Sequence, residues 1–349
     1  MCGTVGMFVG CSAVAYCPVR GPLAARRGSD SGQPAAADGE QPTEEYRSPF
    51  RSWYERASVR QTPRRVLAED RRPGRFFAPD LVPVAGHPLV RKLPDDVFER
   101  LLVQHLYRYL DFTAKLEHLV VNRTVLGIAH GTVGIVLPEE MRLDAYKIYC
   151  DEAYHALFSA DLLWQVRAAT GIDPQLPPQP YFLRRLGALQ RAAPGQLRPL
   201  VELLFVVVSE TLISATLTQA VEDHEVSEAV RNTLQDHALD EGRHHTYFAT
   251  FLRLLWQQLD RPTRQAAAPL VPELIDCFLR PDLVPIRLEL RGYGLAADEV
   301  EQVIEEVLPT SAVTSFGRSA SRQTLRYFSV LGALDDPRAR AGLEQRGLL

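Results

Sequence analysis

The sequence has few cysteines, and they form no disulfide or metal-binding pattern. The 349 residues include five of them: Cys2, Cys11, Cys17, Cys150 and Cys277. Their number is odd and no two are spaced as a CxxC pair, so neither a disulfide framework nor a thiolate metal site is indicated. We therefore expect a reducing, cytoplasmic setting.

The sequence also lacks a basic excess and a long apolar run. A net charge of −4 gives no electrostatic reason to expect nucleic acid as a partner. Glu202 and Glu210 interrupt the most apolar segment, residues 201–221, so no stretch reaches the ~18 apolar residues of a membrane span. We predict that the chain binds neither nucleic acid nor membrane.

What is present is the composition of a globular protein, with 46% hydrophobic and 23% charged residues. Residues 1–45 are rich in Gly, Ala, Ser and Pro, which predicts a disordered N-terminal extension. We expect residues 46–349 to form a single helical domain.

Arginine is concentrated just after the extension. Residues 47–75 contain nine arginines and three acidic residues, together with Pro63 and Pro73. We expect a solvated, partly irregular arm that packs on the core. The alternative is a docking site for an acidic redox partner or carrier protein.

Helical periodicity dominates from Asp95 onward. Apolar residues recur at three- and four-residue intervals over residues 95–131, 138–170, 195–222 and 227–259. Asp95 is a candidate N-cap, Gly131 and Gly171 are candidate stops, and the proline-rich residues 173–180 separate the second helix from the third. No strand-type alternation is evident. The pattern predicts an all-α protein, a ferritin-like four-helix bundle over about residues 95–260 with additional flanking helices.

Acidic residues on apolar helix faces are the main anomaly. Glu117, Glu152, Glu210 and Glu241 each lie in an apolar context on one of the four predicted helices. A carboxylate in an apolar bundle costs several kcal/mol unless it is paired or bound to a metal. Four such residues meeting in one core would require cations.

Histidine spacing supplies nitrogen ligands beside two of these acids. His155 follows Glu152 by three residues, and His244 follows Glu241 by three, so each pair lies on one helix face. The chain order is Glu, Glu-x-x-His, Glu, Glu-x-x-His. This order is typical of di-iron carboxylate bundles, in which two helices give a Glu and two give Glu-x-x-His.

A third histidine shares the face of the second pair. His237 precedes Glu241 by four residues, so we expect it to be a seventh ligand. His245 points roughly 100° away from His244. For His118 and His130 we expect positions in the core or on the surface.

Both Glu-x-x-His pairs are preceded by an aspartate. Metal-bound histidines usually donate their second N–H to a carboxylate. We predict that Asp151 orients His244, that Asp240 orients His155, and that Arg243 is a buried positive partner for an aspartate.

The ligand set indicates the metal. Carboxylates and imidazoles without thiolate suit two iron ions, in the Fe2+ or Fe3+ state, with manganese as an alternative. Zinc held by His237, Glu241 and His244 alone would leave the other four residues unexplained.

At these residues the sequence resembles the p-aminobenzoate N-oxygenase family, di-iron arylamine oxygenases of secondary metabolism. The similarity covers roughly residues 95–260 and includes the His-x-x-x-Glu-x-x-His segment that begins at His237. The resemblance implies oxidation of an amine by O2 to a hydroxylamine, nitroso or nitro product, with electrons from an external reductase or ferredoxin. By position, it implies that the iron ligands are Glu117, Glu152, His155, Glu210, His237, Glu241 and His244.

Other functions use the same residues. A di-metal oxidase could hydroxylate or desaturate a carbon centre, including one on a substrate bound to a carrier protein, and a metal-storage bundle is a third class. The chain could form a homodimer. Substrate contacts are less constrained, and for each candidate plain core or an exposed helix is the simpler expectation. These candidates are Val121, Thr124, Tyr154, Leu157 and Ser214 near the ligands, and Arg318 and Arg322 for a substrate carboxylate.

Overall fold

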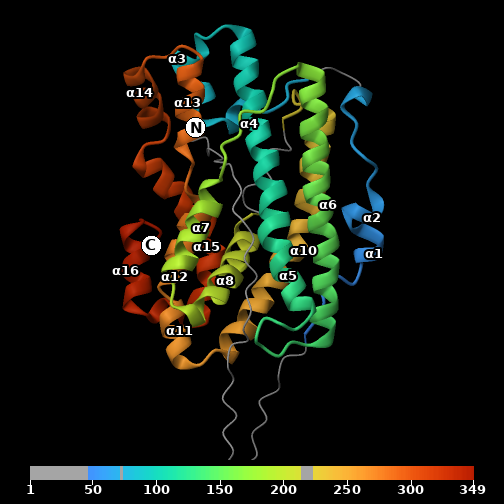
Figure 1. Cartoon of the computed structure of the whole chain (residues 1–349), viewed down its shortest axis with the longest axis vertical. Helices are drawn as coiled ribbons and strands as arrows, with labels where there is room; N and C mark the ends of the chain where they lie inside the picture. Colours follow the sequence, from blue (N-terminus) through green and yellow to red (C-terminus); the bar gives the residue numbers. More distant parts are fainter. Residues whose placement is uncertain (1–45, 71–73, 214–222) are drawn as a thin grey trace, which may run out of the picture.

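The computed structural model describes residues 46–70, 74–213 and 223–349. The predicted disordered extension 1–45 and the candidate pocket residue Ser214 lie outside the described residues. Within them the fold is all-α, as predicted (Figure 1). The only β-type pairing in this part of the chain is an isolated bridge between Arg75 and Val226.

Four long helical segments form a ferritin-like bundle. The first begins as α4 (Asp95–Leu116), continues through a π-helical turn, η4 (Glu117–Val121), and ends as α5 (Asn122–Ala129). The others are α6 (Glu139–Thr170), α8 (Arg198–Leu212) and α10 (Glu228–Gln258). In Figure 1, α4 and α5 run beside α6, on which both pack, and α8 packs on α10.

The helix ends mostly follow the sequence signals. Gly171 ends α6 in the left-handed conformation with a φ of 68°, and Ser227 precedes α10. The prediction of Asp95 as an N-cap was wrong, because Pro94 holds that position and Asp95 is the first helical residue. Proline fixes the extended entry there, and Asp95 still faces the positive end of the helix dipole.

Shorter elements surround the bundle. Before it come α1 (Trp53–Arg56), α2 (Ser58–Gln61) and α3 (Pro88–Arg91), with the 3-10 turns η1 (Leu67–Glu69), η2 (Pro79–Leu81) and η3 (Pro83–Gly86). After α6 come α7 (Tyr181–Ala192) and η5 (Gly195–Leu197). The C-terminal region contains α11 (Arg261–Ala267), α12 (Leu270–Leu279), α13 (Leu283–Gly292), α14 (Ala297–Val307), α15 (Thr310–Val330), η7 (Ala333–Asp335) and α16 (Pro337–Gln345). The predicted flanking helices are therefore present, and α15 has 21 residues.

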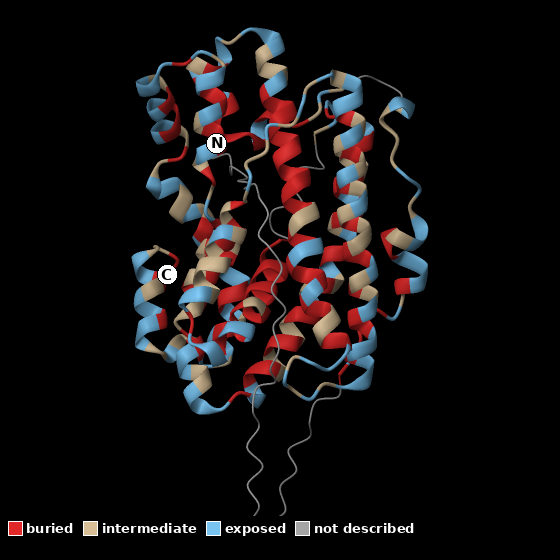
Figure 2. Ribbon diagram, viewed as in Figure 1, coloured by how far each residue is buried: buried red, intermediate tan, exposed pale blue. Residues whose placement is uncertain are grey.

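One hydrophobic cluster runs through the molecule from Tyr46 to Leu348. Figure 2 shows buried residues gathered on α4, α8 and the inner side of α10. No described helix is both long and apolar enough to cross a bilayer.

The arginine-rich segment packs on the outside of the bundle as an arm, which we define as residues 46–65. Its α1 and α2 lie along α6 at the right of Figure 1. The segment thus packs on the core, as expected.

Candidate metal centre

All seven predicted ligands meet inside the bundle. Within the described residues, three groups of side chains bring metal-ligating atoms within 4.8 Å of one another. Every member is buried, and no residue outside the predicted set belongs to any of the three groups. The groups are His155 with His237 and Glu241, Glu152 with Glu241 and His244, and Glu117 with Glu152 and Glu210.

Each of the four bundle segments contributes to this cluster. Glu117 is the first residue of the π-helical turn η4, Glu152 and His155 come from α6, Glu210 comes from α8, and the remaining three come from α10. π-helical turns inside α-helices are frequent at functional sites. Here the turn begins at the residue that faces the other acids.

Glu152 lies between two histidines. Its Oε2 is 2.8 Å from Nδ1 of His155, and its Oε1 is 2.8 Å from Nδ1 of His244. Both imidazoles therefore point their Nδ1 atoms into the cluster and their Nε2 atoms away from it.

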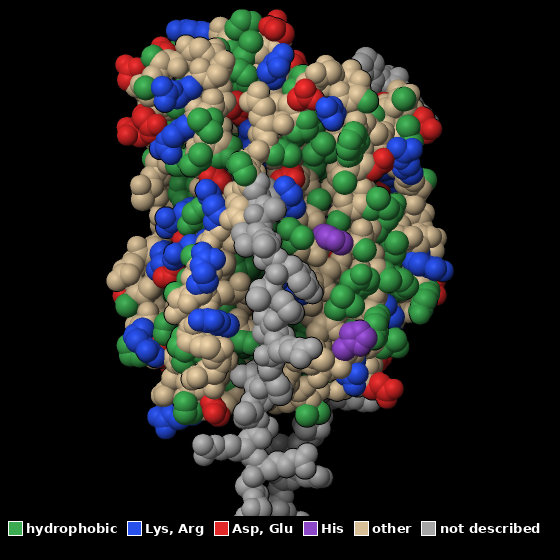
Figure 3. All heavy atoms as spheres, in the orientation of Figure 1, with side chains coloured by type: hydrophobic (Ala, Val, Ile, Leu, Met, Phe, Trp, Pro, Cys, Tyr) green, Lys and Arg blue, Asp and Glu red, His purple; other side chains and the backbone are tan. Residues whose placement is uncertain are grey.

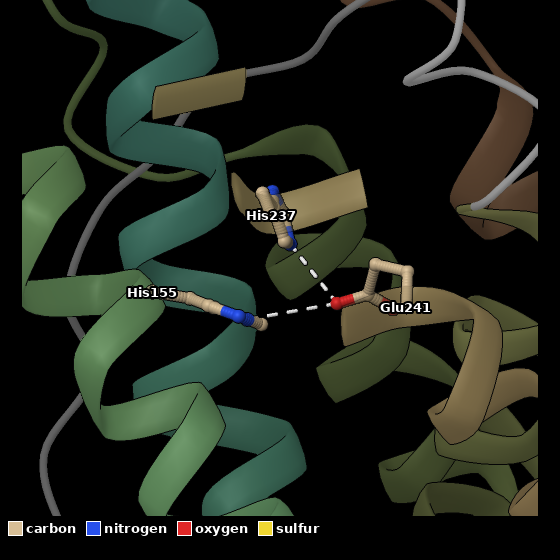
Figure 4. Close-up of side chains that lie close together, drawn as sticks. All are labelled: His155, His237 and Glu241. Atoms are coloured by element: carbon tan, nitrogen blue, oxygen red, sulfur yellow. Dashed lines mark ion pairs between the residues drawn. The ribbon is translucent and has the colours of Figure 1, made fainter. Parts of the chain in front are cut away.

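Glu241 faces three histidines with a single oxygen. Its Oε1 is 3.0 Å from Nε2 of His237, 3.4 Å from Nδ1 of His244 and 3.6 Å from Nδ1 of His155. Figure 4 shows His155 and His237 approaching this oxygen from different helices. His237 thus lies one turn from Glu241 on the same inward face, as its spacing predicted.

The outward Nε2 atoms meet the two aspartates across the bundle. Asp240 Oδ2 is 3.1 Å from Nε2 of His155, and Asp151 Oδ2 is 3.2 Å from Nε2 of His244. Arg243, at 15% side-chain exposure, forms an ion pair with Asp240. The crossed pairing expected from the sequence is therefore present.

The arm completes this outer ring with contacts that the sequence did not predict. Nε1 of Trp53 donates to Oδ1 and Oδ2 of Asp151, at 2.8 and 2.9 Å. Ser58 donates from its backbone N and its hydroxyl to Asp240. Phe50 stacks on His244 with ring centroids 5.9 Å apart. These contacts could not be predicted from the sequence, because an irregular segment has no periodicity that indicates which way its side chains face.

Many of the inward-facing polar atoms lack hydrogen bonds. Both carboxylate oxygens of Glu117, Glu210 and Glu241, both ring nitrogens of His237, Oε1 of Glu152 and Nδ1 of His244 have no partner in hydrogen-bond geometry. Orphaned buried polar atoms are rare in folded proteins, and each is costly. Their concentration at one point indicates that the cluster is arranged for a ligand.

The electrostatics of the cluster point to a cation. Burial, reinforced by the neighbouring carboxylates, raises the pKa of Glu117 and of Glu210 well above the ordinary value. Although burial alone would lower it, Glu152 and Asp240 raise the pKa of His155 to about 10. From the protein groups alone, protons must offset the carboxylate charge, and bound metal cations would offset the same charge.

The residues present fit a pair of transition-metal ions. Four carboxylates and three imidazoles converge, all of them buried, and many of their ligating atoms form no hydrogen bond. Asp151 and Asp240 orient two of the histidines through their outward ring nitrogens. Among the described residues the free cysteines are Cys150, which is exposed, and Cys277, which is buried in contact with Phe182, and neither belongs to these groups.

Two candidate substrate contacts lie off the inward face of α6, and the prediction of Leu157 as a pocket residue was wrong. Leu157 is 62% exposed, and Tyr154 lies under the arm with its hydroxyl 3.5 Å from that of Thr62. His155 marks the inward face of α6, and residues one before and two after it are rotated away by roughly 100° and 200°. Val121 and Thr124 are buried, in agreement with the plain-core alternative.

The other candidates lie outside the cluster. His118 and His130 are exposed, and His245 Nε2 lies 2.9 Å from the hydroxyl of Tyr327. Arg318 and Arg322 are exposed on α15, where Arg318 donates to the carbonyl of Gly347. The exposed-helix interpretation of that segment is therefore confirmed.

Two comparisons with known proteins found matches to this chain. The family model described as P-aminobenzoate N-oxygenase AurF matches residues 48–332, which include the arm from Ser48 and all seven cluster residues. The curated 4-aminobenzoate N-oxygenase of Streptomyces thioluteus is 23% identical over 261 residues, covering 73% of this chain and 77% of that protein.

Proposed function

The chain belongs to the p-aminobenzoate N-oxygenase AurF family, and from this premise we propose that it oxidises the nitrogen of an arylamine or an amino-acid-derived amine with O2. Membership makes it an oxygenase, a class of oxidoreductase. The single observation that supports the proposed chemistry best is the set of buried, unengaged ligating atoms contributed by four helical segments.

Two iron ions would be held by the seven clustered residues. Glu152 and Glu241 each belong to two of the three ligand groups, so these two carboxylates would be central to holding the ions. His155 and His244 would bind through Nδ1, the ring nitrogen that faces the carboxylates, and His237 would add a third imidazole. When bound, such a pair supplies the activation of O2 and the transfer of an oxygen atom.

The protein's own contribution is orientation and exclusion of water. Asp151 and Asp240 hold the Nε2 protons of His244 and His155, which fixes the tautomer that presents Nδ1 to the metal. All seven residues are buried, so water is kept from the reacting atoms and charge interactions inside are strong.

The test is product analysis with labelled oxygen. Iron-loaded protein is given a chemical reductant, 18O2 and a panel of arylamines that includes 4-aminobenzoate. We expect mass spectrometry to find 18O on nitrogen, and none when Glu152→Ala replaces the wild type. Label on carbon, or a desaturated product without label, would overturn N-oxygenation in favour of a carbon-centred oxidase.

A further inference from the structure

The outer surface of the arm is basic and exposed. Arg51, Arg56 and Arg60 are all exposed, and none of them forms an ion pair with the described residues. Glu55 is the only acidic residue between Arg47 and Arg65. In Figure 3, Lys and Arg side chains appear at the right edge of the molecule, where α1 and α2 lie, beside hydrophobic side chains along α6.

Two other arginines of the arm form ion pairs with aspartates of the bundle. Arg64 pairs with Asp161 at 2.8 Å and Arg65 with Asp236 at 2.8 Å, so both anchor the arm to the bundle. The three outward arginines do no such anchoring. Their charge is therefore available to a partner.

An exposed tyrosine lies among these arginines. Tyr54 is 57% exposed, and the guanidinium of Arg60 lies 5.7 Å above its ring centroid. The ring of Tyr54 meets the ring of Trp53 edge to face at 5.1 Å. Trp53 is buried, so this pair joins the surface to the interior.

From Trp53 a continuous set of contacts leads to the metal cluster. Nε1 of Trp53 donates to Asp151 at 2.8 Å, and Asp151 lies 3.2 Å from Nε2 of His244. The opposite nitrogen of the same imidazole, Nδ1, faces Glu152 inside the cluster. The route from the surface to His244 therefore consists of three contacts: Tyr54 with Trp53, Trp53 with Asp151, and Asp151 with His244.

We propose that the outer surface of the arm, formed by Arg51, Tyr54, Arg56 and Arg60, docks an acidic one-electron donor protein, and that Trp53 and Asp151 conduct its electron to His244. The inference rests on the proposed function, because an oxygenase that reduces O2 must receive electrons from outside. In each encounter the donor's iron–sulfur cluster loses one electron and the metal pair gains it. Two encounters deliver a two-electron reduction.

The positive charge of this surface favours a negatively charged partner that binds transiently. Electron-transfer complexes bury little area and depend on electrostatic attraction, which raises the rate of encounter and weakens with salt. Three exposed arginines without ion pairs among the described residues, one of them over the exposed Tyr54 ring, match an acidic surface that carries a redox group near its edge.

Docking is tested by binding, without turnover. The probe is a plant-type [2Fe–2S] ferredoxin, and the variant is Arg51→Glu/Arg56→Glu/Arg60→Glu. The matched control, Arg191→Glu/Arg261→Glu/Arg340→Glu, has the same change of charge at exposed positions on α7, α11 and α16, far from the arm in Figure 1. We expect titration calorimetry at low salt to show binding weakened at least about tenfold by the arm variant but not by the control. Equal weakening in both, or in neither, would overturn the docking surface.

The route is tested by Trp53→Phe, which keeps an aromatic ring at this position but removes the N–H that reaches Asp151. We expect unchanged ferredoxin binding and a slower anaerobic reduction of the iron by ferredoxin, with unchanged reduction by dithionite. A merely structural role would alter iron content or both reductions together. An unchanged ratio of the two rates would remove Trp53 from the route.

Failure of this inference is distinguishable from failure of the proposed function. Arylamine oxidation driven by dithionite needs no docking, so it tests the proposed function alone. If that reaction proceeds and ferredoxin does not bind while an acyl carrier protein does, the basic surface serves a different partner and the proposal is wrong.

Discussion

Glu152 and His244 come from different helices, and Oε1 of one lies 2.8 Å from Nδ1 of the other. The other oxygen of Glu152 lies at the same distance from His155. One carboxylate thus spans the two histidines that the Glu-x-x-His motifs supply. This arrangement is the basis of the proposed metal pair.

Removing either member of this contact should dismantle the metal pair. We expect Glu152→Ala or His244→Ala to retain at most about one metal ion per chain and to lose oxidation activity, because one of the side chains that would hold the ions is missing. His245→Ala is the matched control, since this neighbour contacts Tyr327 instead. Two bound metals with full activity in Glu152→Ala would exclude it from the ligand set.

The carboxylates behind the histidines should tune metal affinity without being ligands. Asp240→Ala leaves Nε2 of His155 and the hydroxyl of Ser58 without their shared partner. Loss of such a partner typically weakens metal binding by about 10–100-fold. Competition with a chelator measures the affinity, with Asp298→Ala at an exposed position on α14 as control. Wild-type metal affinity in Asp240→Ala would show that the contact of Asp240 with His155 does not contribute to metal binding.

The metal-free protein should gain stability when one buried acid is neutralised. Glu210 is fully buried among Glu152 and Glu241, which raise its pKa in addition to the effect of burial. We expect Glu210→Gln to raise the free energy of unfolding of chelator-treated protein by about 1–3 kcal/mol, because removal of a repelled carboxyl group relieves the core. The same variant should lose most of the stabilisation that added iron gives the wild type. A less stable metal-free variant would contradict this account of the core.

A histidine outside the cluster should make stability depend on pH. Burial, and then Arg108, lower the pKa of His105 well below 6.5. In the unfolded chain His105 takes up a proton near its ordinary pKa of about 6.5, whereas in the folded protein it stays neutral to lower pH. The free energy of unfolding therefore falls as the pH drops below about 6.5.

Urea unfolding of metal-free protein measures this effect. Between pH 7.5 and pH 5.5 we expect the wild type to lose about 1 kcal/mol more than His105→Gln, which cannot take up the proton. The exposed-site control His130→Gln should keep the wild-type loss. Equal losses in wild type and His105→Gln would show that His105 is protonated in the fold.

The cluster was predictable because helix geometry is local. Once residues 138–170 are taken as a helix, Glu152 and His155 must share a face, and the same holds for Glu241 and His244. Local spacing could not place the arm. The partners of Trp53 and Ser58 are 98 and 182 residues away in sequence, and no periodic pattern leads to them.

Side-chain direction beyond the ligands was also poorly constrained. Leu157 is apolar and close to His155 in sequence, yet it faces solvent, because proximity along a helix does not mean a shared face. The π-helical turn at Glu117 could not be predicted either, because one extra residue in a turn hardly changes the spacing of apolar residues in an apolar helix.

The most direct test of the central claim is the metal content of the purified protein that carries out the reaction. Elemental analysis and Mössbauer spectroscopy of the active chain should find about two iron ions per chain, coupled through shared ligands. Full activity in a sample that contains no transition metal, or iron that stays bound when Glu117, Glu152, Glu210 and Glu241 are all replaced by Ala, would contradict the account.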